Sequence, residues 1–298
     1  MASLKEIKGR INSIKNTRKI TSAMKMVASV KLHRAQGAIE NLLPYQRKMN
    51  SILTSFLSST DSSFDSPYQA RKEVKRVAIV VFSSNSSLCG AFNATIIKRF
   101  LNTVNSYKGL GKENMYIYPV GKKVEEAAKK LCCEVKGSFQ DMAKKPSYDD
   151  AAKLADTLME QYANGEIDKI DLIFNHFKSS GMQELVYEPF LPVDLTQIGQ
   201  KAKEDTENNE GKRRIDYIVE PSLQEFISNL LPTVLRLRIY TALLDSNASE
   251  HAARTMAMQV ATDNANELIQ DLTKQYNKSR QQAITNELLD IVGGSIKR

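Results

Sequence analysis

The residues closest to a chemical pattern lie in a polar loop that follows the first predicted strand. Residues 83–91 read SSNSSLCGA, which places Cys89 just before a predicted helix. Because the N-terminus of a helix favours a thiolate, Cys89 is a candidate nucleophile. The sequence identifies no base for it, and the alternative interpretation is a small packing thiol at the end of a strand.

The same loop is where nucleotides bind in many alternating α/β folds. Residues 83–91 contain neither the three-glycine dinucleotide fingerprint nor the Gly-Lys-Ser/Thr phosphate loop. Gly121, followed by Lys122 and Lys123, opens a later predicted helix and is a weaker candidate for an anion site. We therefore expect no bound nucleotide and no other cofactor, although a nucleotide-dependent enzyme remains one alternative.

Other ionisable residues do not assemble into a catalytic or metal-binding pattern. Asp149 and Asp150 are adjacent, so they cannot face each other across a scissile bond, and Asp149 is better placed as a helix cap. The histidines and cysteines lack metal-ligand spacing, acidic neighbours or a disulfide framework: His33, His176, His251, Cys89, Cys132 and Cys133. We expect no catalytic site and no metal site.

Two long helical segments are predicted at the ends of the 298-residue chain. Apolar residues recur at steps of three and four over residues 3–57 and again over residues 233–292. At full length each helix would run about 80–90 Å, much longer than a globular core needs. Each apolar stripe is narrow, so we expect the two helices to pair with each other, with Pro44 kinking the first and Pro232 bending or interrupting the second.

Between the helices the pattern is that of a compact α/β body. Strands and helices alternate and predict a βαβαβ sheet: strand 74–82, helix 94–107, strand 116–120, helix 124–131, helix 149–162 and strand 170–177. Extended segments at 184–190 and 215–219 flank a charged stretch at 201–214 that we interpret as a loop. The predicted organisation is an N-terminal helix at 1–58, a central α/β domain at 70–220 and a C-terminal helix at 221–298.

Charge and hydropathy limit the possible partners. The net charge is +8, and basic residues dominate the first 34 positions, where Glu6 is the only acid. An acidic partner is implied, and either nucleic acid or an acidic protein surface would satisfy it. A basic coiled-coil nucleic-acid-binding protein is therefore the second alternative, although aromatic residues do not interleave with the basic ones. No apolar run approaches a membrane span, and the N-terminus lacks a signal-peptide core, so we expect a cytosolic protein.

Short motifs at both ends and in the middle resemble the γ subunits of F-type ATP synthases. The N-terminal motifs are KEI at 5–7, NT at 16–17, KIT at 19–21 and AMKMVA at 23–28. The C-terminal motifs are SE at 249–250, AAR at 252–254, ATDNA at 261–265, YNK at 276–278, RQ at 280–281 and ITNEL at 284–288. In the middle, LCG at 88–90, FN at 92–93, DY at 216–217 and EP at 220–221 also agree.

The resemblance implies a fold and a set of partners. The fold is α/β, with a long antiparallel coiled coil of the N- and C-terminal helices and a central Rossmann-like domain. Such a chain is the central rotor, turning inside a hexamer of α and β subunits, together with the ε subunit and the membrane-embedded c-ring. It has no catalytic site, because ATP chemistry belongs to β. We expect it on the cytoplasmic face of the bacterial inner membrane, as a peripheral protein.

The resemblance also assigns roles to individual positions. Contact with the β subunit is implied for Met24, Leu88, Cys89, Arg254, Gln281, Thr285 and Glu287. Contact with the c-ring is implied for Tyr217 and Glu220. The chain departs from the family where Asn85, Ser86 and Ser87 replace Asp-Arg-Gly, where Ser295 replaces alanine, and in its basic end, Lys297 and Arg298. The cysteine-bearing insertion of chloroplast members is absent, so we expect no thiol switch.

Overall fold

The computed structural model describes residues 4–59, 66–68, 73–131, 133–193 and 222–295. The chain divides into two compact units. One contains Met1–Val30 with Arg254–Arg298, and the other contains Lys31–Ala253. The α/β body is therefore grouped with the adjoining parts of both long helices. The predicted division places the body and the two helices in separate segments, 1–58, 70–220 and 221–298, and it stays a prediction.

Both predicted terminal helices are confirmed as continuous elements. Helix α1 spans Leu4–Ser59, and Pro44 lies inside it without ending it. Helix α7 spans Leu223–Ser295, so it begins before the predicted residue 233 and passes through Pro232 without interruption. Buried Leu230, Leu231 and Leu235 surround Pro232, and their packing offsets the hydrogen bond that proline cannot donate.

Within the first unit, α1 and α7 run antiparallel. Arg18 donates to Asn266 at 3.1 Å, and the hydroxyls of Thr21 and Thr262 are 2.9 Å apart, so later positions in α1 meet earlier positions in α7. In the second unit the same two helices pack through an alanine-rich cluster: Leu32, Ala35, Ala248 and Ala252. Alanines at such a seam let two helix backbones approach closely. The predicted antiparallel coiled coil is confirmed.

The body is built on a five-stranded sheet with the order β3-β2-β1-β4-β5. The strands are β1 (Val77–Phe82), β2 (Met115–Val120), β3 (Glu134–Val135), β4 (Lys169–Ser179) and β5 (Met182–Leu191). The helices between them are α2 (Phe92–Ser106), α3 (Lys122–Lys130), α4 (Gln140–Lys144) and α5 (Tyr148–Ala163), with short 3₁₀ turns at Lys108–Leu110 and Lys112–Asn114. The first four strands in this order are parallel, and β5 pairs antiparallel with β4.

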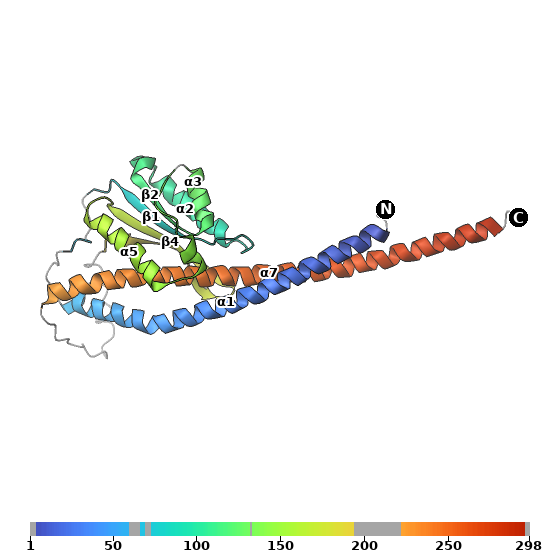
Figure 1. Ribbon diagram of the computed structural model, residues 1–298, viewed down its shortest axis with the longest axis horizontal. Coiled ribbons are helices and arrows are strands. Elements are labelled where there is room, and N and C mark those ends of the chain that lie inside the picture. Colours follow the sequence, from blue (N-terminus) through green and yellow to red (C-terminus); the bar gives the residue numbers. More distant parts are fainter. Residues whose placement is uncertain (1–3, 60–65, 69–72, 132, 194–221, 296–298) are drawn as a thin grey trace. The chain divides into compact units, whose positions relative to one another are not determined.

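Alternating side chains of β1 bury on the two faces of the sheet. Val77, Ile79 and Val81 join the core beneath α2 and α3. The intervening residues 78, 80 and 82 join the core beneath α5 and α7. Figure 1 shows α2 and α3 on one side of the sheet, with α5 and the adjoining part of α7 on the other. All six residues of β1 are buried, as the continuous apolar run predicts.

Sequence patterns missed the shorter elements. Strand β3 has two residues and helix α4 has five, too few to show a period. The extended segment expected at 184–190 is β5, an edge strand whose Glu184, Glu188 and Pro189 protect it from further pairing. The segment expected at 215–219 lies outside the described residues. Among the described helices, none is long and apolar enough to cross a membrane.

A buried carboxylate joins α3 to the segment that follows β3. Glu125 is only 7% exposed, and it accepts hydrogen bonds from Lys129 at 2.6 Å, Ser138 at 2.8 Å and Gln140 at 2.9 Å. These three bonds lower the pKa of Glu125 to about 2, and the bond from Lys129 has the largest effect. The ionised form is therefore the one that the fold stabilises.

We expect Glu125→Gln to lower the free energy of unfolding by about 1–2 kcal/mol at pH 7. Because the folded pKa is depressed, this stabilisation is complete above the ordinary value of 4.5 and is lost as the pH falls through about 2. Urea unfolding of the full chain between pH 7 and pH 2 should show the difference between variant and wild type shrinking. Glu126→Gln, at a half-exposed neighbour, is the control; a difference independent of pH would contradict this account.

Candidate functional site

The loop after β1 lies at the carboxyl edge of the parallel strands. From β1 the chain crosses to β2 on one side, while β4 lies on the other, so the strand order reverses at this point. Ligands of open α/β sheets bind at such a reversal. The loop is therefore the position in the fold at which a Rossmann-like domain would bind a nucleotide.

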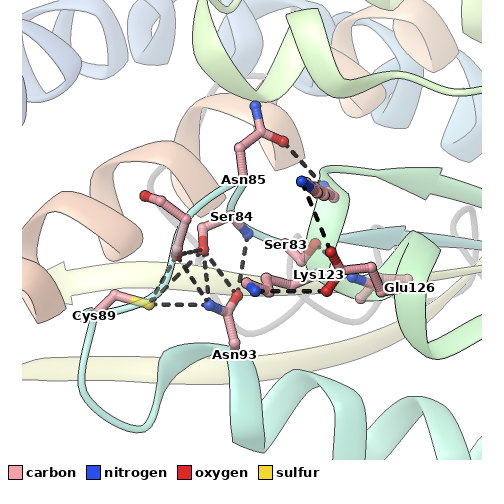
Figure 2. Close-up of polar contacts among 10 residues, drawn as sticks. Ser83, Ser84, Asn85, Cys89, Asn93, Lys123 and Glu126 are labelled. Atoms are coloured by element: carbon pink, nitrogen blue, oxygen red, sulfur yellow. Dashed lines mark hydrogen bonds and ion pairs between the residues drawn. The ribbon is translucent and has the colours of Figure 1, made fainter.

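Side chains of the loop and of α2 bind one another (Figure 2). The backbone N–H of Ser84 donates to Oδ1 of Asn93 at 3.2 Å. Asn93 Nδ2 donates to Ser84 Oγ at 2.8 Å and to Cys89 Sγ at 3.1 Å. Ser84 Oγ donates to the carbonyl of Ser86 at 2.6 Å. The loop is thus closed on itself by Asn93.

The opposite side of the loop caps the start of α3. Asn85 points away from Asn93, and its Oδ1 accepts the backbone N–H of Lys122 at 2.9 Å (Figure 2). Ser83 Oγ accepts the N–H of Val124 at 3.1 Å, and the carbonyl of Ser84 accepts the N–H of Lys123 at 3.2 Å. These are the free N–H groups through which a helix N-terminus binds anions. An anion here would have to displace three oxygens of the protein itself.

The lysines at the start of α3 are also paired. Lys123 lies 3.5 Å from Glu126, and Lys122 lies 3.9 Å from the other oxygen of the same carboxylate. Gly121 is needed because the chain passes so close to β1: a Cβ on it would lie 2.2 Å from the carbonyl oxygen of Ser83, and its φ is +109°. The sequence GKK at 121–123 therefore has a structural explanation that requires no phosphate.

Cys89 has the environment of a packing thiol. It is 2% exposed, and its sulfur contacts Ser84, Ser86 and Asn93, none of which is a base. Activation of a thiol for nucleophilic attack needs a base, a cation or a metal nearby. The structure favours the packing interpretation over the nucleophile.

Leu88 has the most unusual backbone in the loop. Its φ is 66°, the one positive φ of a non-glycine residue in the described ranges, and the residue is 61% exposed. A left-handed conformation costs about 1–2 kcal/mol for such a residue. The hydrogen bonds among Ser84, Asn93 and Cys89 hold the adjoining backbone, and they offset the cost of this conformation.

The other predicted contact residues lie on the long helices or outside the described residues. In the first unit, Met24 is half-buried, Arg254 is 8% exposed, and three residues near the end of α7 are exposed: Gln281, Thr285 and Glu287. Thr285 Oγ1 donates to the carbonyl of Gln281 at 2.9 Å, one turn earlier. Tyr217 and Glu220 lie outside the described residues. The fold thus brings together Leu88 with Cys89, and Gln281 with Thr285.

Two ion pairs and one hydrogen-bonded His–Asp pair, none of them predicted from the sequence, join α7 to the body. Arg236 Nε lies 2.7 Å from Asp156 of α5, Arg238 Nε lies 3.0 Å from Glu188 of β5, and His176 Nδ1 of β4 lies 2.6 Å from Asp245. The expectation that His176 has no acidic neighbour was wrong, because the partner is distant in sequence. Burial raises the pKa of Asp245, and the hydrogen bond from His176 opposes that shift. The charged residues beside the apolar stripe of α7 were the one feature of the sequence that could have indicated these pairs.

A second unexpected polar cluster surrounds Asp171, which is fully buried in β4. The hydroxyls of Tyr107 and Tyr187 donate to its Oδ2 at 2.6 and 2.8 Å, and Lys169 Nζ lies 3.5 Å from its Oδ1. Burial, followed by hydrogen bonding with Asp171 and Tyr187, raises the pKa of Tyr107. These donors stabilise a buried carboxylate, which is a structural role. No group of His, Cys, Asp and Glu residues suited to a metal ion occurs in the part of the chain that the structure describes.

We expect Gly121→Ala to lower the free energy of unfolding by about 2–4 kcal/mol, because a side chain there meets Ser83 and forces a left-handed residue. Gly181→Ala is the matched control, since a Cβ at that position meets nothing within 4 Å. Thermal melting of the two full-length variants would measure the difference. Equal melting temperatures would show that the approach of Gly121 to Ser83 is not required.

Comparison with known proteins identifies the family. The family model described as ATP synthase matches residues 3–296. A protein named ATP synthase gamma chain from Bacteroides thetaiotaomicron is 64% identical over 300 residues, covering 100% of both chains.

Solved structures show the same fold. A chain in the cryo-EM structure of the Euglena gracilis mitochondrial ATP synthase, containing OSCP, F1 and the c-ring, has a TM-score of 0.63 at 20% identity and covers 97% of this chain and 92% of its own. A chain in the central stalk and c-ring structure of the Tetrahymena thermophila mitochondrial enzyme has a TM-score of 0.55 at 24% identity, covering 81% and 99%. From the family model and the full-length identity, this chain belongs to the family of ATP synthase gamma chains.

Proposed function

We propose that this chain is the central rotor of an F-type ATP synthase. It couples proton-driven rotation of a c-ring to ATP synthesis or hydrolysis at the catalytic β subunits of an α/β hexamer, with an ε subunit bound beside it. The observation that carries the proposal is the 64% identity to an ATP synthase gamma chain over the full length of both proteins. The solved relatives include a central stalk and c-ring, and the comparisons give no support to a nucleic-acid-binding protein.

The helices have the physical properties that a rotor needs. Their inner faces are joined by polar and small residues, such as the Thr21 and Thr262 pair. The outer face of α1 carries both apolar and basic residues: Ile20, Met26 and Val27 are exposed beside Lys19 and Lys25. Scattered exposed contacts of this kind give complementarity without one dominant tight site, which suits a shaft that must release each β subunit in turn.

ATP chemistry is assigned to the partner subunits. The one position in the body where a Rossmann-like fold would bind phosphate already has its N–H groups occupied by Ser83, Ser84 and Asn85. Nothing in the described loop supplies a base or a phosphate-binding lysine that is unpaired. We therefore assign the chain a mechanical role and no catalytic site of its own.

The predicted contact residues divide by exposure. Leu88, Gln281, Thr285 and Glu287 offer surface that a β subunit can touch, and Met24 offers part of one. Cys89 and Arg254 are buried, so we propose that they act by positioning exposed neighbours. We also propose that Tyr217 and Glu220 contact the c-ring. The chain then lies at the cytoplasmic side of the membrane as a peripheral protein.

Affinity purification of the tagged chain from membranes at low ionic strength tests the assembly. We expect recovery of α and β subunits in molar excess, together with ε and c subunits and ATPase activity. Mass spectrometry would identify the partners. Recovery of the chain alone, or with nucleic acid released by salt, would reject the rotor and favour the basic coiled-coil alternative.

Gln281→Ala is expected to lower coupled ATP synthesis by the assembled complex about fivefold, the effect of losing roughly 1 kcal/mol of contact with β. Gln282→Ala is the matched control, because Gln282 is also exposed but lies about 100° around the helix. Synthesis in proton-loaded vesicles and circular dichroism of the free chain would separate function from folding. Equal rates in both variants would remove Gln281 from the contact surface.

A further inference from the structure

Two ion pairs and one hydrogen-bonded His–Asp pair fasten α7 to three different elements of the body, all within the unit Lys31–Ala253. We call them the α7 clamp: Arg236 with Asp156, Arg238 with Glu188, and Asp245 with His176. All six side chains lie at the margin of the buried core, with Asp245 the most enclosed. Partly buried pairs of this kind are less screened than exposed ones.

Helix geometry makes the clamp act from two sides. Residues two apart on an α-helix point about 200° apart, so Arg236 and Arg238 reach in nearly opposite directions, one to α5 and one to β5. Between them the apolar stripe, which includes Leu235 and Ile239, faces the sheet. A rotation of α7 about its own axis in either direction would pull at least one arginine away from its carboxylate.

The clamp also fixes α7 along its axis. Arg238 and Asp245 are seven residues apart, so they lie on one face of the helix, about 10 Å apart along it. The positive Arg238 meets the acidic Glu188, and Asp245 shares a hydrogen bond with His176, both partners belonging to the β4–β5 hairpin. Sliding the helix by a turn would leave both side chains without their partners. Two further bonds lie beside them: Ser249 to the carbonyl of Asn175, and Asn247 to the carbonyl of Ala143, each 3.1 Å.

We infer that the α7 clamp carries torque between the body and the long helices. Apolar burial holds α7 against the sheet, but hydrophobic contact is non-directional and resists sliding or twisting weakly. Charge-assisted hydrogen bonds are directional and fix orientation. This inference rests on the proposed rotor function, and it concerns residues outside every predicted contact with β or the c-ring.

The test uses the assembled complex of α, β and this chain, immobilised through the hexamer. A bead is attached at Ser180→Cys, in the exposed turn of the β4–β5 hairpin, so that torque generated by ATP hydrolysis must pass from the helices through the body. The variant is Arg236→Ala with Arg238→Ala. We expect unloaded ATPase within about twofold of wild type, and stalling torque against bead drag lowered at least about twofold.

Matched variants distinguish torque transfer from general destabilisation. Lys178→Ala with Glu184→Ala removes an ion pair of 2.6 Å that lies wholly within the hairpin and does not reach α7, so torque should be unchanged. Arg238→Glu alone should lower the torque, and adding Glu188→Arg should restore it. This rescue keeps the test decisive even where the double alanine variant folds poorly.

Three outcomes would overturn the inference. They are wild-type torque in the double alanine variant, equal torque loss in the hairpin control, and failure of the charge exchange to restore torque. A wild-type complex that hydrolyses ATP without turning the bead would instead reject the proposed rotor function, and the inference with it. Lowered torque with rescue would establish the clamp.

Discussion

The structure depends on the burial of one face of α7 against the sheet of the body. Leu235, Ile239 and Ala242 share a core with β1 and α5, and each large side chain so buried stabilises the fold by about 1.5–3 kcal/mol. The burial of several such side chains together therefore exceeds the roughly 3 kcal/mol that Pro232 costs inside a helix. The helix can therefore remain a single element from the body into the other unit, which a mechanical role requires.

The Rossmann-like body uses its usual ligand-binding position for packing. Because crossovers are right-handed, helices cover both faces of a parallel sheet only where the chain reverses the direction in which it adds strands, and ligands commonly bind at that reversal. Here Ser83 and Asn85 cap α3, and Gly121 brings that helix into contact with β1. A fold alone therefore does not identify a function.

Local pattern predicted the elements that are long or continuously apolar. The six buried residues of β1 and the periodic stripes of α1 and α7 are such cases, and the terminal motifs identified the family. Pattern could not predict β3, which is set by its neighbour β2, or the pairing of Asp245 with His176 across 69 positions. These depend on which surfaces meet after folding, and no local period records that. The geometry of Leu88 was equally hidden, because leucine disfavours a positive φ.

Exposure separates the candidate contacts into two physical kinds. An exposed side chain such as Gln281 gains its contact energy only when a partner arrives, so its removal leaves the free chain unchanged. A buried one such as Cys89 already contributes packing and a hydrogen bond with Asn93, so its removal changes the free chain first. Leu88 joins the two kinds. Its exposed side chain projects from a strained backbone that the buried residues around it hold in place, so the loop already has its shape in the free chain, and a partner that bound it would not have to order it.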